Sequence, residues 1–167
     1  MSLENLSKSW SNLLLASNGA TSLKGNSSKI TFHEDRERVR KIRDLSSVIL
    51  IGGNTLRTYP YQKMDKQILV SSRREVGTFK NIHFFNLSPL DLLEYATIRY
   101  SSPLLIEGGV NFVKPLIQNR RLETLFLGRS NTSGDDNFFD EDILKKNYNL
   151  MDVTEYNQGR LETWSCL

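Results

Sequence analysis

The chain contains very few of the residues that form disulfides and zinc sites. Of its 167 residues, one is a cysteine, Cys166, and two are histidines, His33 and His83. A single cysteine cannot form an intramolecular disulfide, so the composition is typical of a protein from a reducing compartment. No cysteine and histidine stand at the spacing of zinc ligands, and we expect no metal site.

Long apolar runs are also missing. Runs such as Val48 to Ile51 and Leu104 to Ile106 are far shorter than the roughly 20 residues that a membrane-spanning helix needs. The first dozen residues, MSLENLSKSWSN, lack the apolar stretch of a secretory signal. We therefore predict a cytoplasmic protein that does not bind a membrane.

Neither strong charge nor a common catalytic motif marks the sequence. The 22 Lys and Arg against 19 Asp and Glu give a net charge of +3. The basic residues are scattered or gathered at positions 36–43, without interleaved aromatics, so no nucleic-acid partner is predicted and a small anionic ligand stays open. The Gly-Lys-Ser/Thr phosphate loop, the Gly-x-Ser-x-Gly elbow and the Gly-x-Gly-x-x-Gly fingerprint are absent.

What the sequence does have is an alternation of apolar runs and amphipathic stretches. Its length and 38% hydrophobic content predict one domain over residues 1–167, with residues 1–9 expected to be disordered. Period-2 and apolar runs predict strands at 13–16, 47–51, 68–71, 82–85, 104–106 and 122–127, and a closing hairpin at 148–156 and 160–166. Residues 131–142 are predicted to form a polar loop.

Three helices are expected between these strands. Thr31 stands three residues before Glu34, which predicts a capping box and a helix to about Arg43. The pair Ser88-Pro89 predicts a second helix start. A third helix is expected past Gly109, where Pro115 requires a start near residue 111 or a kink. This order predicts an α/β fold with a mostly parallel sheet, helices on both faces and an antiparallel edge.

Two strands end in Gly-Gly, at residues 52–53 and 108–109. Ligands of such sheets lie beyond the carboxyl ends of parallel strands, and bare main chain there can approach a phosphate closely. The second pair leads into a helix start, so the candidate donors to a pyrophosphate are the backbone N–H groups of Gly108, Gly109, Val110, Asn111 and Phe112. The alternative is that both pairs merely form tight turns.

Glu107 follows the apolar run Leu104 to Ile106 directly. A carboxylate at such a position is partly withdrawn from water and needs a partner. A sugar hydroxyl or a ring N–H of a ligand would serve as that partner. The alternative is an ion pair with a nearby arginine.

Several stretches taken together resemble the reductase domain of riboflavin biosynthesis, a pyrimidine reductase with a dihydrofolate-reductase-like fold. These are "LLLASNGAT", "SSKITFHEDRERVRKIRDLSSVILIGGNT", "KQILVSS" and "LLIEGGVNFVKPLIQNRRLETLFL". The likeness spans about residues 10–166 and implies a three-layer fold, NADPH as the cofactor and a homodimer. The implied substrate is a small phosphorylated pyrimidine, 5-amino-6-(5-phosphoribosylamino)uracil.

The resemblance also implies residue roles. Thr55, Ser72 and the backbone from Gly109 through about Pro115 would touch NADPH. Ser27, Arg43 and Glu107 would meet the substrate, with the Arg43 guanidinium suited to gripping a phosphate. No residue is singled out as a catalytic acid or base.

The sequence departs from the family at several positions. Asn18 stands where the family has an aspartate, Lys29 where it has an aromatic residue, and Tyr59 where an acid precedes the proline. Two alternatives therefore remain beside the riboflavin-pathway reductase. One is an NADPH oxidoreductase of the same fold with a different substrate, and the other is a non-catalytic nucleotide-binding homologue.

Overall fold

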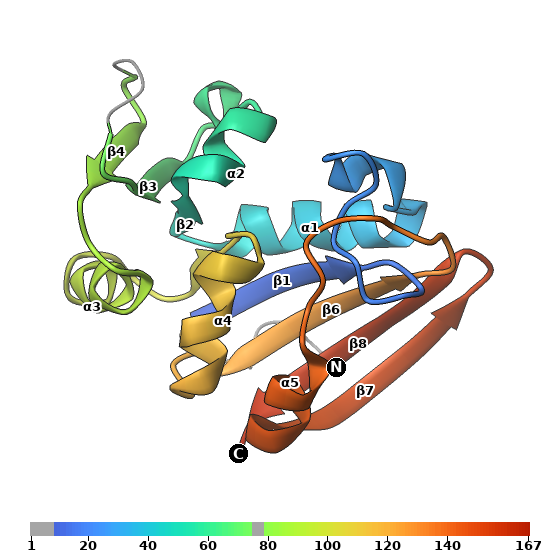
Figure 1. Cartoon of the computed structure of the whole chain (residues 1–167). Helices are drawn as coiled ribbons and strands as arrows, with labels where there is room; N and C mark the ends of the chain where they lie inside the picture. The colour runs from blue at the N-terminus through green and yellow to red at the C-terminus, as the bar shows by residue number, and fades with distance from the viewer. Residues whose placement is uncertain (1–8, 75–78) are drawn as a thin grey trace.

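The computed structural model describes residues 9–74 and 79–167. These residues form one sheet of eight strands in the order β4-β3-β2-β5-β1-β6-β8-β7 (Figure 1). The strands from β4 to β6 pair in parallel, whereas β8 runs antiparallel to β6 and to β7. The predicted α/β class, with a mostly parallel sheet and an antiparallel C-terminal hairpin, is confirmed.

The strands have the following bounds: β1 Ser9–Leu15, β2 Val48–Gly52, β3 Gln67–Ser71, β4 Ile82–Phe85, β5 Leu104–Ile106, β6 Thr124–Ser130, β7 Tyr148–Tyr156 and β8 Gly159–Cys166. The helices are α1 His33–Leu45, α2 Gly53–Thr58, α3 Pro89–Arg99, α4 Val110–Gln118 and α5 Glu141–Asn147, with short 3-10 turns η2 Ser27–Lys29 and η3 Tyr61–Lys63. The disorder expected over residues 1–9 falls, for residues 1–8, outside the described part of the chain, and Ser9 begins β1.

Helices cover both faces of the sheet, which makes three layers. Helices α3, α4 and α5 pack on one face, where Leu50 of β2 joins their apolar cluster. Ile42 of α1 packs on the other face, where Ile49 and Ile51 point. Because β2 is buried on both faces, its sequence is a continuous apolar run rather than an alternating one.

Two element starts differ from the prediction. The first strand begins at Ser9 rather than Leu13, because the Ser11 hydroxyl is buried and donates to the carbonyl of Ile106 at 3.0 Å. The capping box at Thr31 is wrong. The N-cap of α1 is Phe32, and the Thr31 hydroxyl donates instead to the Asp35 carboxylate at 3.1 Å.

Two helices escaped prediction, α2 and α5. Helix α5 begins at Glu141, inside the segment predicted as loop, where the Asp140 carboxylate accepts from the N–H of Asp142 at 3.1 Å. The predicted strand at 122–127 runs instead from Thr124 to Ser130. Helix α4 starts at Val110 and tolerates Pro115 inside it.

No helix within residues 9–74 and 79–167 is both long and apolar enough to cross a membrane.

Candidate active site

A cleft of about 1240 Å³ opens beyond the carboxyl ends of β3, β2, β5 and β1. All ten predicted site residues line it: Ser27, Arg43, Thr55, Ser72, Glu107, Gly108, Gly109, Val110, Asn111 and Phe112. A second hollow of about 500 Å³ lies at the opposite ends of β2 and β3, around Ser47 and Gln67. We take the larger cleft as the candidate site because the carboxyl ends of parallel strands and the N-termini of α2 and α4 converge there.

The two Gly-Gly corners lie side by side and are directly connected. The backbone N–H of Gly109 donates to the Thr55 hydroxyl at 3.2 Å. Thr55 belongs to α2, which follows Gly52, and Gly109 is the N-cap of α4. The structure therefore brings the strand ends of β2 and β5 into one wall of the cleft.

The glycines of these corners differ in what they make room for. A Cβ on Gly108 would lie 2.4 Å from side-chain atoms of Phe112, so this glycine is needed for packing. A Cβ on Gly53 would lie 3.0 Å from the Ser72 hydroxyl. At Gly109 the nearest atom would be the Thr55 hydroxyl at 3.8 Å, which leaves the cleft side open. The tight-turn alternative thus accounts for Gly108, whereas Gly109 has room for the close approach of a ligand.

The predicted donors on α4 are only partly available. The N–H of Gly109 is bonded to Thr55, and that of Phe112 donates to the carbonyl of Gly109 at 2.9 Å. The N–H groups of Val110 and Asn111 belong to the first turn and have no acceptor within the helix. These two amides, at the positive end of the helix dipole, are the better anion donors.

Arg43 and Glu107, both predicted to meet the substrate, are bonded to each other. Arg43 Nε lies 2.6 Å from Glu107 Oε1 and Nη2 lies 2.7 Å from Oε2, and the Tyr61 hydroxyl donates to Oε2 at 2.9 Å. Burial lowers the pKa of Arg43, but the bonds and charge of Glu107 outweigh it and raise that pKa above its usual value. Burial, followed by the Glu107 charge, raises the pKa of Tyr61. The alternative of an ion pair for Glu107 is confirmed.

Sequence reasoning missed Asp35, a carboxylate in the cleft wall that is only 3% exposed. Its oxygens contact the Thr31 hydroxyl and, at 3.5 Å, the Arg38 guanidinium. Burial raises the pKa of Asp35 and outweighs the opposing charge of Arg38. The sequence did carry a signal for this residue: Asp35 falls on the same helix face as Phe32 and Ile42, where an apolar residue is expected.

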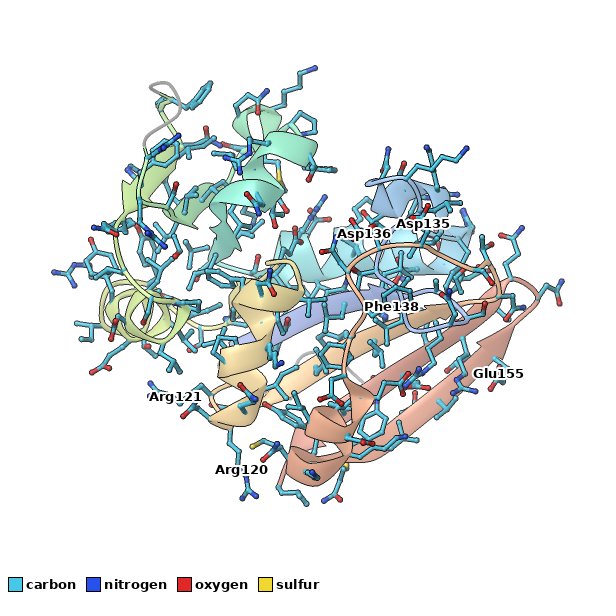
Figure 2. The ribbon with its side chains drawn as sticks, in the orientation of Figure 1. Arg120, Arg121, Asp135, Asp136, Phe138 and Glu155 are labelled. Carbon is cyan, nitrogen blue, oxygen red and sulfur yellow. The ribbon has the colours of Figure 1, made fainter. Side chains whose placement is uncertain are left out.

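Another part of the cleft wall comes from the segment 17–28, which carries Ser27. It is tied to residues 131–139, a segment on which Figure 2 labels Asp135 and Asp136. Thr21 N–H donates to the carbonyl of Asp136 at 3.1 Å, and Lys24 N–H donates to the Asp135 carboxylate at 2.7 Å. The Asn18 side chain both donates to and accepts from the backbone of Gly134. An ionised aspartate could not donate there, so asparagine fits this position.

The remaining predicted residue, Ser72, follows β3 at the rim of the cleft. Its hydroxyl donates to the carbonyl of Arg74 at 2.7 Å and accepts from the Arg74 N–H at 3.2 Å. It therefore holds the turn after β3. Within residues 9–74 and 79–167 there is no cluster of three or more His, Cys, Asp or Glu that could hold a metal ion.

Comparison with known proteins shows which solved structures share this fold. No protein-family model and no curated protein matches the sequence. Among solved structures, a diaminohydroxyphosphoribosylaminopyrimidine deaminase/5-amino-6-(5-phosphoribosylamino)uracil reductase from Thermotoga maritima matches with a TM-score of 0.75 at 13% identity, over 96% of this chain and 56% of that chain. A dihydrofolate reductase from Enterococcus faecalis, complexed with NADP(H) and RAB-propyl, matches with a TM-score of 0.72 at 15% identity, over 95% and 96%.

This chain spans little more than half of the Thermotoga protein. At these identities the likeness concerns the fold. The chain therefore has the dihydrofolate-reductase-like fold that its resemblance to the riboflavin-pathway reductase domain predicted.

Proposed function

We propose that this protein is a cytoplasmic NADPH-dependent reductase of 5-amino-6-(5-phosphoribosylamino)uracil. The observation that carries the proposal is the convergence of all ten predicted cofactor and substrate residues on one cleft. The Thermotoga neighbour is named for this reductase activity, and the Enterococcus neighbour is complexed with NADP(H). Both names support the proposal by analogy of fold.

The residues present fit a dinucleotide. The amides of Val110 and Asn111 would bind the pyrophosphate, and Thr55 and Ser72 would line the ribose and adenine side. Arg57 and Arg73 also line the cleft, where their positive charge favours an anionic ligand. Bound NADPH would supply the hydride. The chain's own part would be to hold the nicotinamide and the acceptor carbon in contact and to exclude water.

The substrate end has to be assigned differently from the sequence prediction. Because Arg43 is neutralised by Glu107, it is a weak phosphate ligand. Arg36 and Arg40, four residues apart on α1, also line the cleft and are exposed. We assign the substrate phosphate to these two residues, and hydrogen bonding to the sugar or ring to Ser27 and the Arg43 and Glu107 pair.

NADPH titration followed by cofactor fluorescence tests cofactor binding. Gly109→Val would fill the open side of the corner and is expected to weaken binding at least about tenfold, whereas Ile98→Val on the exposed surface of α3 is the control. Turnover of the pyrimidine ribotide tests the substrate. Glu107→Gln and Arg36→Ala are each expected to raise KM for it. The absence of NADPH binding by the wild type would end the proposal.

A second candidate keeps the cofactor and changes the substrate. Asp35 favours this candidate. Burial raises the pKa of its carboxyl group, which lines the cleft and therefore stays protonated to higher pH than an exposed aspartate. Such a group can donate a proton to a nitrogen or oxygen next to the carbon that is reduced. NADPH oxidation with dihydrofolate, lost in Asp35→Asn while the pyrimidine ribotide stays inert, would select this candidate. NADPH binding without turnover of either compound would leave a non-catalytic homologue.

A further inference from the structure

Tyr59 is an aromatic residue left partly bare in the cleft. It is 42% exposed and lines the cleft at the end that Arg43 and Glu107 form. The Arg43 guanidinium lies 4.5 Å from the Tyr59 ring centroid, and its Nη1 donates to the Tyr59 hydroxyl at 2.8 Å. The Tyr61 ring packs beside it at 4.9 Å. These contacts fix the orientation of the ring before any ligand arrives.

The ion pair beside Tyr59 carries little net charge. Glu107 takes two hydrogen bonds from Arg43 and one from Tyr61, and its side chain is only 7% exposed. The positive charge of Arg43 is therefore balanced where it contacts Tyr59. A fixed aromatic ring beside a neutral, hydrogen-bonded pair is suited to a flat, uncharged group rather than to a phosphate.

We propose that Tyr59 is a specificity-determining residue that stacks against the planar nitrogen heterocycle of the substrate. Stacking on an aromatic side chain attracts any such ring, because each presents a π-face. The ring would be a pyrimidine or a pterin, which share this chemistry. The proposal rests on the proposed function only in taking this end of the cleft as the substrate end.

Calorimetric titration of the full chain tests the proposal with three probes: uridine 5′-monophosphate, pterin-6-carboxylate and ribose 5-phosphate. We expect at least one heterocycle to bind, and ribose 5-phosphate to bind at least about tenfold more weakly than that heterocycle. Tyr59→Leu should weaken heterocycle binding about 5- to 100-fold. Tyr59→Phe loses the bond to Arg43 but keeps the ring, and should bind within about threefold of the wild type.

Tyr95 supplies a matched control. Its ring is also covered by a guanidinium, that of Arg99 at 4.0 Å, but it lies on α3 outside the cleft. Tyr95→Leu should leave heterocycle binding unchanged. Equal binding by the wild type and Tyr59→Leu, or binding of neither heterocycle, would overturn the proposal. Upfield shifts of the Tyr59 ring protons in the ligand-bound wild type test stacking even if Tyr59→Leu does not fold.

The outcome is separable from that of the proposed function. NADPH titration reports on the Val110 and Asn111 amides, and heterocycle titration reports on Tyr59. A protein that binds a heterocycle through Tyr59 but does not bind NADPH would refute the reductase and retain the stacking site. The reverse result would refute the stacking site alone.

Discussion

Gly108 contributes to stability because it leaves room for the Phe112 side chain. An added Cβ would overlap Phe112, which is 6% exposed in the core, at 2.4 Å. We expect Gly108→Ala to lower the free energy of unfolding by roughly 1–3 kcal/mol or more, as overpacked cores do. Urea denaturation checks this. Gly109→Ala is the matched control, since its Cβ has space and should change stability by less than about 1 kcal/mol. Equal losses in both variants would contradict the assignment.

The buried carboxyl of Asp35 should give the protein a distinctive pH dependence. Burial raises its pKa above the ordinary 3.8, so the unfolded chain ionises at this residue before the folded one does. The stabilising contribution of this group is then fully present below pH 3.8 and is lost as the pH rises through the folded pKa, by about 1.4 kcal/mol for each unit of difference.

Asp35→Asn should remove this fall. We expect the free energy of unfolding of Asp35→Asn, measured in urea, to be close to that of the wild type at low pH. As the pH rises towards neutral, the variant should become more stable relative to the wild type. Asp44→Asn, at the exposed end of the same helix, is the control. A wild type and an Asp35→Asn variant with parallel pH profiles would show that the carboxyl titrates normally.

At the scale of elements, the start of α3 shows a cap that the sequence predicted correctly. The Ser88 hydroxyl accepts from the N–H of Asp91 at 3.2 Å, and Pro89 occupies the first turn. Ser88→Ala should cost about 1 kcal/mol of stability in urea denaturation. Ser88→Thr keeps the hydroxyl, which also donates to the Asp91 carboxylate at 2.6 Å, and should recover most of the loss. Full stability of Ser88→Ala would mean that the cap contributes nothing.

Thr31 shows why the same kind of signal failed at α1. The Thr-x-x-Glu pattern is local, but Asp35 is buried and competes for the Thr31 hydroxyl. Buried polar groups take the nearest partner they can. Tertiary burial of one acid therefore overrode a capping preference that spacing alone favours.

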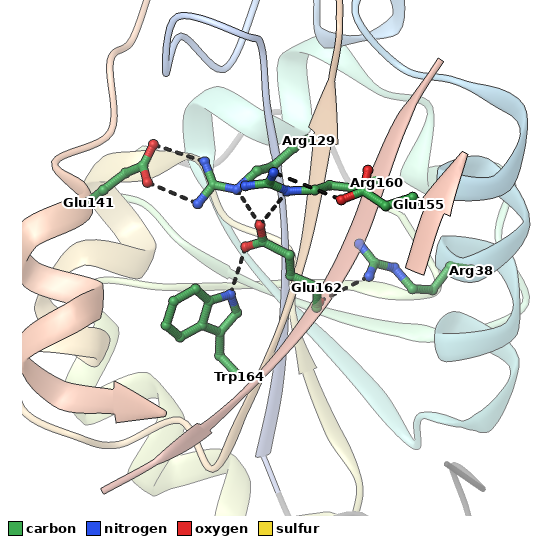
Figure 3. Close-up of polar contacts among 7 residues, drawn as sticks. All are labelled: Arg38, Arg129, Glu141, Glu155, Arg160, Glu162 and Trp164. Carbon is green, nitrogen blue, oxygen red and sulfur yellow. Dashed lines mark hydrogen bonds and ion pairs between the residues drawn. The ribbon is translucent and has the colours of Figure 1, made fainter. Parts of the chain in front are cut away.

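The final hairpin was predicted, but the charges that fasten it were not. Glu162 is 2% exposed and accepts from Arg129, Arg160 and Trp164, while Arg129 also binds Glu141 of α5 (Figure 3). A buried acid in β8 gives no signal in a strand pattern, because what marks it is its set of partners, Arg129 of β6 and Arg160 and Trp164 of β8 itself. The bonds from Arg129 to Glu141 hold the first residue of α5 against the sheet, in the segment that was predicted to be a loop.

For the whole molecule, the order of apolar runs was enough to predict the fold class, and the resemblance predicted the architecture. The candidate cleft was predictable because the two Gly-Gly corners follow strands that prove to be neighbours. Asp35 and the neutralisation of Arg43 were not predictable, because they depend on contacts between distant segments. Spacing places residues near a sheet edge, and packing decides which charges remain available.

The homodimer implied by the resemblance remains a proposal, and β7 offers a surface for it. This edge strand is exposed after Tyr148 and carries large apolar residues, Leu150, Met151, Val153 and Tyr156, that are 37–55% exposed. Leu150 pairs with Trp164 of β8, and Val153 pairs with Glu162. Trp164 and Glu162 are two residues apart and lie on one face of β8, so the register shift in β7 places Leu150 and Val153 on that same face. A free apolar edge of this length is a template for pairing.

The charges along β7 favour a second copy as the partner. Arg120 lies near the start of β7, beside Asn147, whereas Glu155 lies towards its other end (Figure 2). Antiparallel pairing about a two-fold axis would place Arg120 of one copy near the Glu155 and Arg160 pair of the other, and Leu150 opposite Val153. The β7 edges of the two copies would then pair with their apolar side chains aligned and with Arg120 of each copy near Glu155 of the other.

We therefore expect a dimer in light scattering coupled to size exclusion, and Val153→Lys to shift it to a monomer by placing two lysines near the axis. Ile98→Lys, at a residue 75% exposed on α3, is the control and should stay dimeric. High salt should weaken the wild-type dimer, because its end-to-end charge pairs are exposed. A wild type that is monomeric at high concentration would show instead that the bulge and the acids Asp152 and Glu155 protect this edge from pairing.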